Sequence, residues 1–224
     1  MLPFTTDIHL TRMLSAAKVE VVVDIGANVG QQGIALRACG YRGQIISFEP
    51  GSAAFARLRR TSRRDPKWSI HNVGIAPSGG QGRLRLTADM GMSSSLLEPG
   101  EDLKLRLPGA LPITSESVDL ITLSDVFDLI SSEPGNIWIK MDIQGLEGQL
   151  LRSIESMPQR VIGMKLEAAF GDLYVGGLGL RELLAEVERL GFELAALSQG
   201  KIDRMGVAFY GDIFVLRKDL ERST

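Results

Sequence analysis

Two charged motifs carry the side chains best suited to chemistry. Lys140-Met-Asp142 and Lys165-Leu-Glu167 each close an apolar run, and each places an ammonium and a carboxylate two residues apart. Side chains two apart lie on one face of a strand, so each motif presents both charges on the same side. If the two strands are neighbours, the four charges meet at the carboxyl edge of a sheet, where open α/β folds bind ligands. Buried charges are costly unless they are paired, so the cluster predicts either a catalytic site or a structural network of ion pairs.

A glycine-containing turn between two apolar strands marks a second candidate site. A run of valines leads into Asp24, and the turn that follows carries Gly26, Asn28 and Gly30 ahead of a predicted helix. A glycine turn between strand and helix lets the backbone approach a ligand and points free N–H groups at it. The next apolar strand ends on Glu49, where an acid can bind ribose hydroxyls. This arrangement predicts a ligand that contains a nucleoside.

The spacing of this turn distinguishes between nucleoside ligands. Dinucleotide folds carry Gly-x-Gly-x-x-Gly so that a pyrophosphate can approach the backbone, whereas the order Gly26, Asn28, Gly30 contains no Gly-x-Gly. Asp24 would also repel a pyrophosphate. An acid there suits a ligand with positive charge, such as the ammonium and sulfonium groups of S-adenosylmethionine. The turn therefore favours this cofactor over a nicotinamide dinucleotide.

Length and composition limit the classes of function. At 224 residues the chain can bury a sizeable core and is predicted to form one domain, 1–224. Net charge −2 and a sequence pI near 5.8 argue against a general nucleic-acid binder, which would be basic. The single cysteine, Cys39, excludes a disulfide framework within the chain and favours a reducing cytoplasm. Residues 1–18 contain no apolar stretch typical of a signal peptide or membrane span. They are predicted to form a short amphipathic helix.

Helix and strand signals alternate along the chain, which predicts a parallel sheet with helices on both faces. Strands are expected near 19–24, 44–48, 68–73, 83–87, 120–123, 137–142, 161–167, 192–197 and 212–216, and later helices at 52–64, 145–157 and 180–190. Segment 79–115 is rich in glycine, proline and serine. We expect it to be an acceptor-side insertion that begins as a half-exposed strand and continues as a long loop over 89–115.

Several motifs together resemble the FkbM family of O-methyltransferases. The main ones are DIGANVGQ from Asp24, SFEP ending at Pro50, and KMDIQGLEGQLLRS from Lys140. The resemblance extends over nearly the whole chain, through HNVGIA at 71–76, the serines at 93–95, Leu173-Tyr174, the turn at 190–192 and GDIF at 211–214. The family often has Thr-Leu-Asp where this chain has Thr-Leu-Ser-Asp at 122–125, which leaves the role of Asp125 open.

This resemblance implies a Rossmann-like class I methyltransferase with a seven-stranded, mostly parallel sheet whose last strand is antiparallel. It implies S-adenosyl-L-methionine as cofactor and an acceptor bound over the fourth and fifth strand ends, at Asp142 and Glu167. The residues implied to bind the cofactor are Asp24, Gly26, Asn28, Gly30, Glu49, Asn72 and Val73. The placement of the acceptor agrees with the separate argument from charge.

The predicted reaction is an in-line transfer of the cofactor's methyl group to a hydroxyl oxygen. Asp142 is the predicted base, Lys140 orients it or the acceptor, and Glu167 is the third catalytic candidate. The candidate acceptor-binding residues are Ser94, Ser95 and Tyr174. A sugar hydroxyl on a glycolipid or surface glycan is the predicted acceptor. FkbM-like enzymes methylate such hydroxyls, and the serines and carboxylates suit a hydroxyl-rich ligand.

Several alternatives stay open. The acceptor could be the hydroxyl of a polyketide or another small natural product. An NAD-dependent oxidoreductase would share the fold, and a non-catalytic module would bind cofactor without turnover. A basic run could contact an anionic membrane surface, although such runs are more often solvated helix faces; it comprises Arg57, Arg59, Arg60, Arg63 and Arg64. Asp142 and Glu167 could together bind a divalent cation, but no histidine or further carboxylate motif completes such a site, so no metal is assigned and metal dependence stays a lesser alternative.

Overall fold

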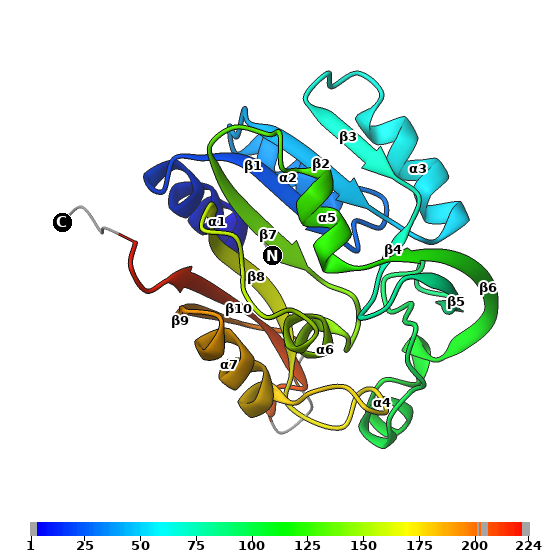
Figure 1. Ribbon diagram of the computed structural model, residues 1–224. Helices are drawn as coiled ribbons and strands as arrows, with labels where there is room; N and C mark the ends of the chain where they lie inside the picture. Colours follow the sequence, from blue (N-terminus) through cyan, green and yellow to red (C-terminus); the bar gives the residue numbers. More distant parts are fainter. Residues whose placement is uncertain (1–3, 201, 203–205, 221–224) are drawn as a thin grey trace.

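A seven-stranded sheet forms the centre of the molecule, with the strand order β3-β2-β1-β7-β8-β10-β9 (Figure 1). The computed structural model describes residues 4–200, 202 and 206–220. The strands of this sheet are β1 (Val19–Ile25), β2 (Gln44–Phe48), β3 (Trp68–His71), β7 (Asn136–Met141), β8 (Val161–Ala169), β9 (Phe192–Gln199) and β10 (Tyr210–Arg217). The predicted α/β fold is confirmed.

Burial on both faces explains why the central strands are nearly continuous apolar runs. Every residue of β1 except Glu20 is buried, and β7 is buried from Ile137 to its end. β1 lies parallel between β2 and β7, and β7 lies parallel to β8 with Lys140 opposite Lys165. β10 runs antiparallel to both β8 and β9, as the resemblance implied for the last strand. The two charged motifs therefore lie at or near the carboxyl ends of adjacent parallel strands.

Helices cover both faces of this sheet. They are α1 (Phe4–Ala16), α2 (Gln31–Ala38) and α3 (Ser52–Ser62) on one face, and α5 (Leu123–Leu129), α6 (Glu147–Arg152) and α7 (Leu180–Arg189) on the other. Successive residues of β7 serve the two cores: Trp138 packs with the first group and Ile139 with the second. Figure 1 shows α5, α6 and α7 together in front of the sheet. α6 is shorter than the helix predicted over 145–157.

The chain between β3 and α5 forms a second, three-stranded sheet. Its strands are β4 (Gly74–Ile75), β5 (Gly80–Thr87) and β6 (Pro112–Ile121), with β6 in the middle and β5 antiparallel to it. A short helix, α4 (Glu101–Arg106), and a 3-10 turn, η1 (Pro108–Ala110), lie between β5 and β6. The prediction of an irregular loop over 89–115 is therefore wrong for these segments. The predicted strand at 120–123 is the end of β6 and the start of α5.

Among the described residues, no helix combines the length and the apolarity needed to cross a bilayer. α1 packs through Leu10 and Leu14 into the core that contains Trp138. The first helix thus supports the sheet that carries the candidate site.

Candidate active site

The loops that follow β1, β2, β7 and β8 surround a cavity of about 480 Å³ at the carboxyl edge of the sheet. Segment 89–96, α4 and η1 also contribute to its wall. A cavity of this size at this edge is the usual ligand site of an open α/β sheet. The structure brings all four charged residues of the two motifs to it: Lys140, Asp142, Lys165 and Glu167.

The glycine turn after β1 lies directly against the loop after β7. Gly26 has φ +75°, and a Cβ atom there would lie 2.0 Å from the carbonyl oxygen of Asp142. Gly30 has φ +93°, and a Cβ atom there would lie 3.1 Å from the ring of Trp68. Asn28 also adopts the left-handed conformation, with φ +48°, which asparagine tolerates better than most residues. Gly26 and Asn28 line the cavity, so the turn brings backbone close to any ligand bound there.

Glu49 connects the glycine turn to the loop after β2. Its carboxylate accepts hydrogen bonds from the backbone N–H groups of Asn28 (2.8 Å) and Gly51 (2.7 Å). The residue is only 8% exposed, and it lines the cavity. Burial raises the pKa of Glu49 to about 7, although the two hydrogen bonds and Lys140 oppose the shift. Each oxygen keeps a free lone pair, so the charged form can still accept a hydrogen bond from a ligand hydroxyl.

Lys140 lies between two carboxylates, Asp24 and Asp142, and pairs with both. Its Nζ lies 3.1 Å from Asp24 Oδ1 and 3.7 Å from Asp142 Oδ2, and it donates to the carbonyl oxygen of Gly26 at 2.7 Å. Burial alone would lower the pKa of Lys140, but Asp24 and Asp142 outweigh it and raise the pKa. Lys140 therefore stays charged and cannot serve as a base. Asp24 is fully buried behind it and is not among the cavity-lining residues, so its direct contact with a cofactor stays a prediction.

Lys165 pairs with a residue that sequence analysis did not propose for the site. Its Nζ lies 3.1 Å from Asp212 Oδ2, on β10, and donates to Gln32 Oε1 at 3.5 Å. Asp212 lies opposite Glu167 in the antiparallel ladder, and both line the cavity. Its only sequence signal was the GDIF motif within the family resemblance.

Gln144 joins the carboxylates of the two motifs, and sequence analysis did not propose it for the site. Its Nε2 donates to Asp142 Oδ1 (2.7 Å) and to Glu167 Oε1 (3.1 Å). Its Oε1 accepts a hydrogen bond from the hydroxyl of Tyr174. Gln144 has φ +56°, and such strained non-glycine conformations cluster at functional sites. As a neutral side chain in a turn, it offered no signal except its position two residues after Asp142.

The surroundings of Glu167 raise its pKa. Burial is the main cause, and the carboxylates of Asp142, Glu147 and Asp212 add to it, so the pKa of Glu167 lies well above its ordinary value. Burial and nearby carboxylates also raise the pKa of Tyr174, which remains a hydrogen-bond donor. Beside Asp142 the site therefore presents the hydroxyl of Tyr174 and, at Glu167, a carboxyl group that binds its proton more tightly than usual.

The other predicted contact residues have different surroundings. Ser94 and Ser95 both line the cavity, but the Ser95 hydroxyl donates to the carbonyl oxygen of Gln144 at 2.7 Å and helps to hold that loop. Val73 lines the cavity. Asn72 is exposed, donates to the carbonyl oxygen of Glu49 at 2.9 Å, and is not among the lining residues. The roles of these residues in ligand binding stay predictions.

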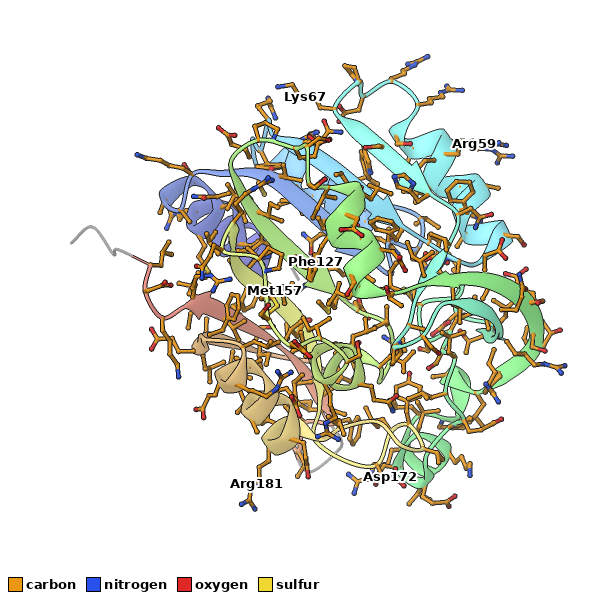
Figure 2. The ribbon with its side chains drawn as sticks, in the orientation of Figure 1. Arg59, Lys67, Phe127, Met157, Asp172 and Arg181 are labelled. Carbon is orange, nitrogen blue, oxygen red and sulfur yellow. The ribbon has the colours of Figure 1, made fainter. Side chains whose placement is uncertain are left out.

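Asp125 and the basic run of arginines both lie outside the cavity. Asp125 forms a capping box with Thr122 at the start of α5, so its carboxylate is used by the helix terminus. The five arginines of the basic run are all exposed, and Figure 2 shows Arg59 at the outer edge of α3. Contact of this face with a membrane surface stays a prediction.

Residues 24–194 match the family model of the methyltransferase FkbM domain. The chain belongs to the FkbM methyltransferase family. FkbM methyltransferases use S-adenosyl-L-methionine, so the predicted family and cofactor are confirmed. Membership of this family sets aside the NAD-dependent oxidoreductase. A comparison with curated proteins found no match to the chain.

The chain is also similar to several solved structures. Magnesium protoporphyrin IX methyltransferase (ChlM) from Synechocystis PCC 6803 with bound SAM is 9% identical, with 95% of this chain and 78% of that chain covered and a TM-score of 0.49. TehB from Haemophilus influenzae is 10% identical, with 97% of this chain and 64% of that chain covered and a TM-score of 0.50. A putative O-methyltransferase from Klebsiella pneumoniae is 10% identical, with 97% of this chain and 81% of that chain covered and a TM-score of 0.49. At these identities the similarity concerns the fold alone.

The cavity of this FkbM methyltransferase suits its cofactor. Gly26 and Asn28 line the cavity, and Glu49 brings to the same wall a carboxylate of the kind expected to bind ribose hydroxyls. The carboxylates around the cavity outnumber the ammonium groups of Lys140 and Lys165, which favours a cationic ligand. Within the described ranges, no group of three or more histidine, cysteine, aspartate or glutamate side chains is arranged to hold a metal ion.

Proposed function

We propose that this FkbM methyltransferase transfers a methyl group to a hydroxyl oxygen, with Asp142 as the base that accepts the hydroxyl proton. The position of the Asp142 carboxylate carries the proposal. It lines the cavity, its side chain is 40% exposed, and Gln144 and Lys140 hold its two oxygens. A carboxylate fixed in this way keeps lone pairs directed to solvent, where a hydroxyl can donate.

The chain's own residues would act mainly by alignment. S-adenosyl-L-methionine supplies a sulfonium methyl group, whose carbon–sulfur bond breaks with its electron pair going to a neutral thioether. Holding an acceptor oxygen in line with that bond can contribute roughly 7 to 11 kcal/mol. A positioned base adds about 10² to 10⁴ in rate. Gln144 and Lys140 would keep Asp142 in place while it takes the proton that the acceptor loses.

A sugar hydroxyl on a glycolipid or surface glycan is the acceptor that we place first. Besides Asp142 the cavity offers the carboxyl group of Glu167, whose pKa is raised, and the hydroxyls of Tyr174 and Ser94, which can accept as well as donate hydrogen bonds. Vicinal sugar hydroxyls both donate and accept, so they match such a mixed set. The hydroxyl of a polyketide or another small natural product is the second candidate, since it needs only the base and the methyl donor.

The test is a product screen with a base variant as control. The wild-type protein is incubated with S-adenosyl-L-methionine and an extract of glycans and glycolipids, and products that gain one methyl group are identified by mass spectrometry. Asp142→Asn keeps the shape of the side chain but removes its charge, so turnover should fall by about 10² to 10⁴ while affinity for S-adenosylhomocysteine persists. Equal turnover in the two proteins would remove Asp142 as the base. A methyl group found on nitrogen would contradict O-methylation.

A further inference from the structure

A third apolar cluster stands apart from the two cores that cover the sheet. Its buried members are Leu103, Leu173, Tyr174 and Phe209, and Leu107, Ala110 and Tyr210 are among the residues that pack against them. These residues come from α4, η1, the loop after β8 and the start of β10. Backbone hydrogen bonds fix the arrangement: the N–H of Gly100 donates to Leu173 (2.8 Å), and that of Asp102 to Asp172 (3.0 Å). Figure 1 shows α4 beside this loop and far from α3.

Much of this cluster faces the cavity instead of a sheet. The acceptor wall, as we call it, comprises the cluster members that line the cavity: Leu103, Leu107, Ala110, Leu173, Tyr174 and Tyr210. None of them carries a charge. Leu107 and Ala110 are only half-buried, so part of their apolar surface remains open. Apolar surface that lines a cavity favours an apolar ligand group, because its burial removes both surfaces from water.

The acceptor wall is continuous with the carboxylates at the reaction edge. Tyr174 belongs to the wall, and its hydroxyl donates to Gln144, which in turn holds Asp142 and Glu167. The glycine turn lies against the carbonyl oxygen of Asp142 and lines the same cavity. A ligand with its hydroxyl at Asp142 would thus be close to both the cofactor turn and the apolar wall.

We propose that the acceptor wall binds the apolar, non-reacting part of an amphiphilic acceptor while the acceptor's hydroxyl reaches Asp142. This proposal rests on the proposed hydroxyl acceptor and narrows its class. A wholly polar free sugar would leave the wall in contact with water. A sugar attached to an apolar group, or a hydroxyl on a largely apolar molecule, would cover it. Of the wall residues, sequence analysis named only Tyr174 as an acceptor contact, since Leu103, Leu107 and Ala110 lie in the segment 89–115 that was expected to be a long loop.

A binding experiment tests the wall without knowledge of the natural acceptor. The probe is 2-naphthol, a hydroxyl on an apolar body, titrated by fluorescence into protein saturated with S-adenosylhomocysteine. Leu107→Gln should weaken binding of 2-naphthol by at least about tenfold, and Ala110→Gln should do the same. Leu105→Gln is the matched control, since Leu105 lies on α4, is 79% exposed and does not line the cavity. Affinity for S-adenosylhomocysteine should be unchanged in all three variants.

The outcomes separate this proposal from the proposed function. The wall is overturned if wild-type protein does not bind 2-naphthol, or if Leu107→Gln and Ala110→Gln bind it as tightly as Leu105→Gln. It is also overturned if an acceptor with an apolar part is methylated with the same kcat/KM by wild type and Leu107→Gln. If 2-naphthol binds as expected but the natural product carries its methyl group on nitrogen, the O-methylation proposal fails and the wall stands.

Discussion

At the scale of single residues, the hydrogen bonds of Glu49 and its burial have opposite effects on its charge. It holds Asn28 and Gly51 through hydrogen bonds that favour the carboxylate, yet burial raises its pKa to about 7. Hydrogen bonds from ribose hydroxyls would favour the carboxylate further. Ligand binding at this residue should therefore be coupled to the loss of a proton near neutral pH.

Cofactor affinity should consequently depend on pH through Glu49. Affinity for S-adenosylhomocysteine should rise between pH 6 and pH 8 in the wild type, as measured by titration calorimetry. Glu49→Gln should flatten this rise, and Glu49→Ala should cost roughly 1.5 to 3 kcal/mol of binding free energy. Glu147→Gln is the control: Glu147 is also buried with its pKa raised to about 7, but it does not line the cavity. Wild-type affinity in Glu49→Ala would show that the cofactor lies elsewhere.

Residue types revealed the charges of the site but not their partners. Lys140 and Asp142 were recognised because an ammonium and a carboxylate follow a buried strand. The pairing of Lys165 with Asp212 depends on β10 lying beside β8, which no local pattern encodes. Gln144 is neutral, and its importance appears only when its contacts to both motifs are seen.

At the scale of elements, the turn after β1 and the loop after β7 are packed against each other without space between them. The contact is backbone to backbone, at Gly26 and the carbonyl oxygen of Asp142. A backbone atom cannot rotate away as a side chain can. The position of the cofactor turn and the position of the proposed base are thus set by one contact.

Substitution of Gly26 should therefore cost more than its backbone conformation alone explains. Gly40→Ala is the matched control, since Gly40 has φ +96° but nothing within 4 Å of an added Cβ. It should lose about 1 to 2 kcal/mol of unfolding free energy from backbone strain. Gly26→Ala adds a contact at 2.0 Å to similar strain, so it should lose more stability and also affinity for S-adenosylhomocysteine. Urea unfolding measures the first effect; equal losses in the two variants would mean that the loops do not constrain each other.

Elements with a buried face could be predicted from the sequence, whereas elements held by distant partners could not. β1 and β7 can be recognised in the sequence because they are nearly continuous apolar runs. β6 has Val118 as its one buried residue and is stabilised by pairing with β5, so its sequence shows no apolar face. Ser52 looks like the cap of α3, but Glu116 of β6 accepts hydrogen bonds from both the N–H and the hydroxyl of Ser52.

At the scale of the whole molecule, buried acids should make the folded state less stable as pH rises toward neutrality. Burial raises the pKa values of Glu49 and Glu147 from 4.5 to about 7, and it raises the pKa of Glu167 as well. An acid whose pKa is raised on folding binds its proton more tightly in the native state. Its favourable contribution is complete below pH 4.5 and is lost as pH rises through 7.

The free energy of unfolding of the ligand-free protein should therefore fall between pH 5 and pH 7.5. Each group contributes roughly 1.4 kcal/mol per unit by which its pKa is raised. Denaturant titrations at several pH values measure the slope, and Glu49→Gln or Glu147→Gln should reduce it. Acids whose pKa is lowered act in the opposite sense below pH 4, among them Asp89 and Asp125. A stability that is constant or rises from pH 5 to pH 7.5 would show that these carboxyl groups are charged in the native state.

The sheet order also has a consequence for synthesis on the ribosome. β10 follows β9 in the chain but lies between β8 and β9, and it is the strand that joins them. Until residues 210–217 leave the exit tunnel, β9 has no neighbour in the sheet and β8 has an open edge. Unpaired strand edges attract other chains. The unpaired edges of β8 and β9 in the nascent chain must therefore avoid pairing with other chains until residues 210–217 have left the exit tunnel.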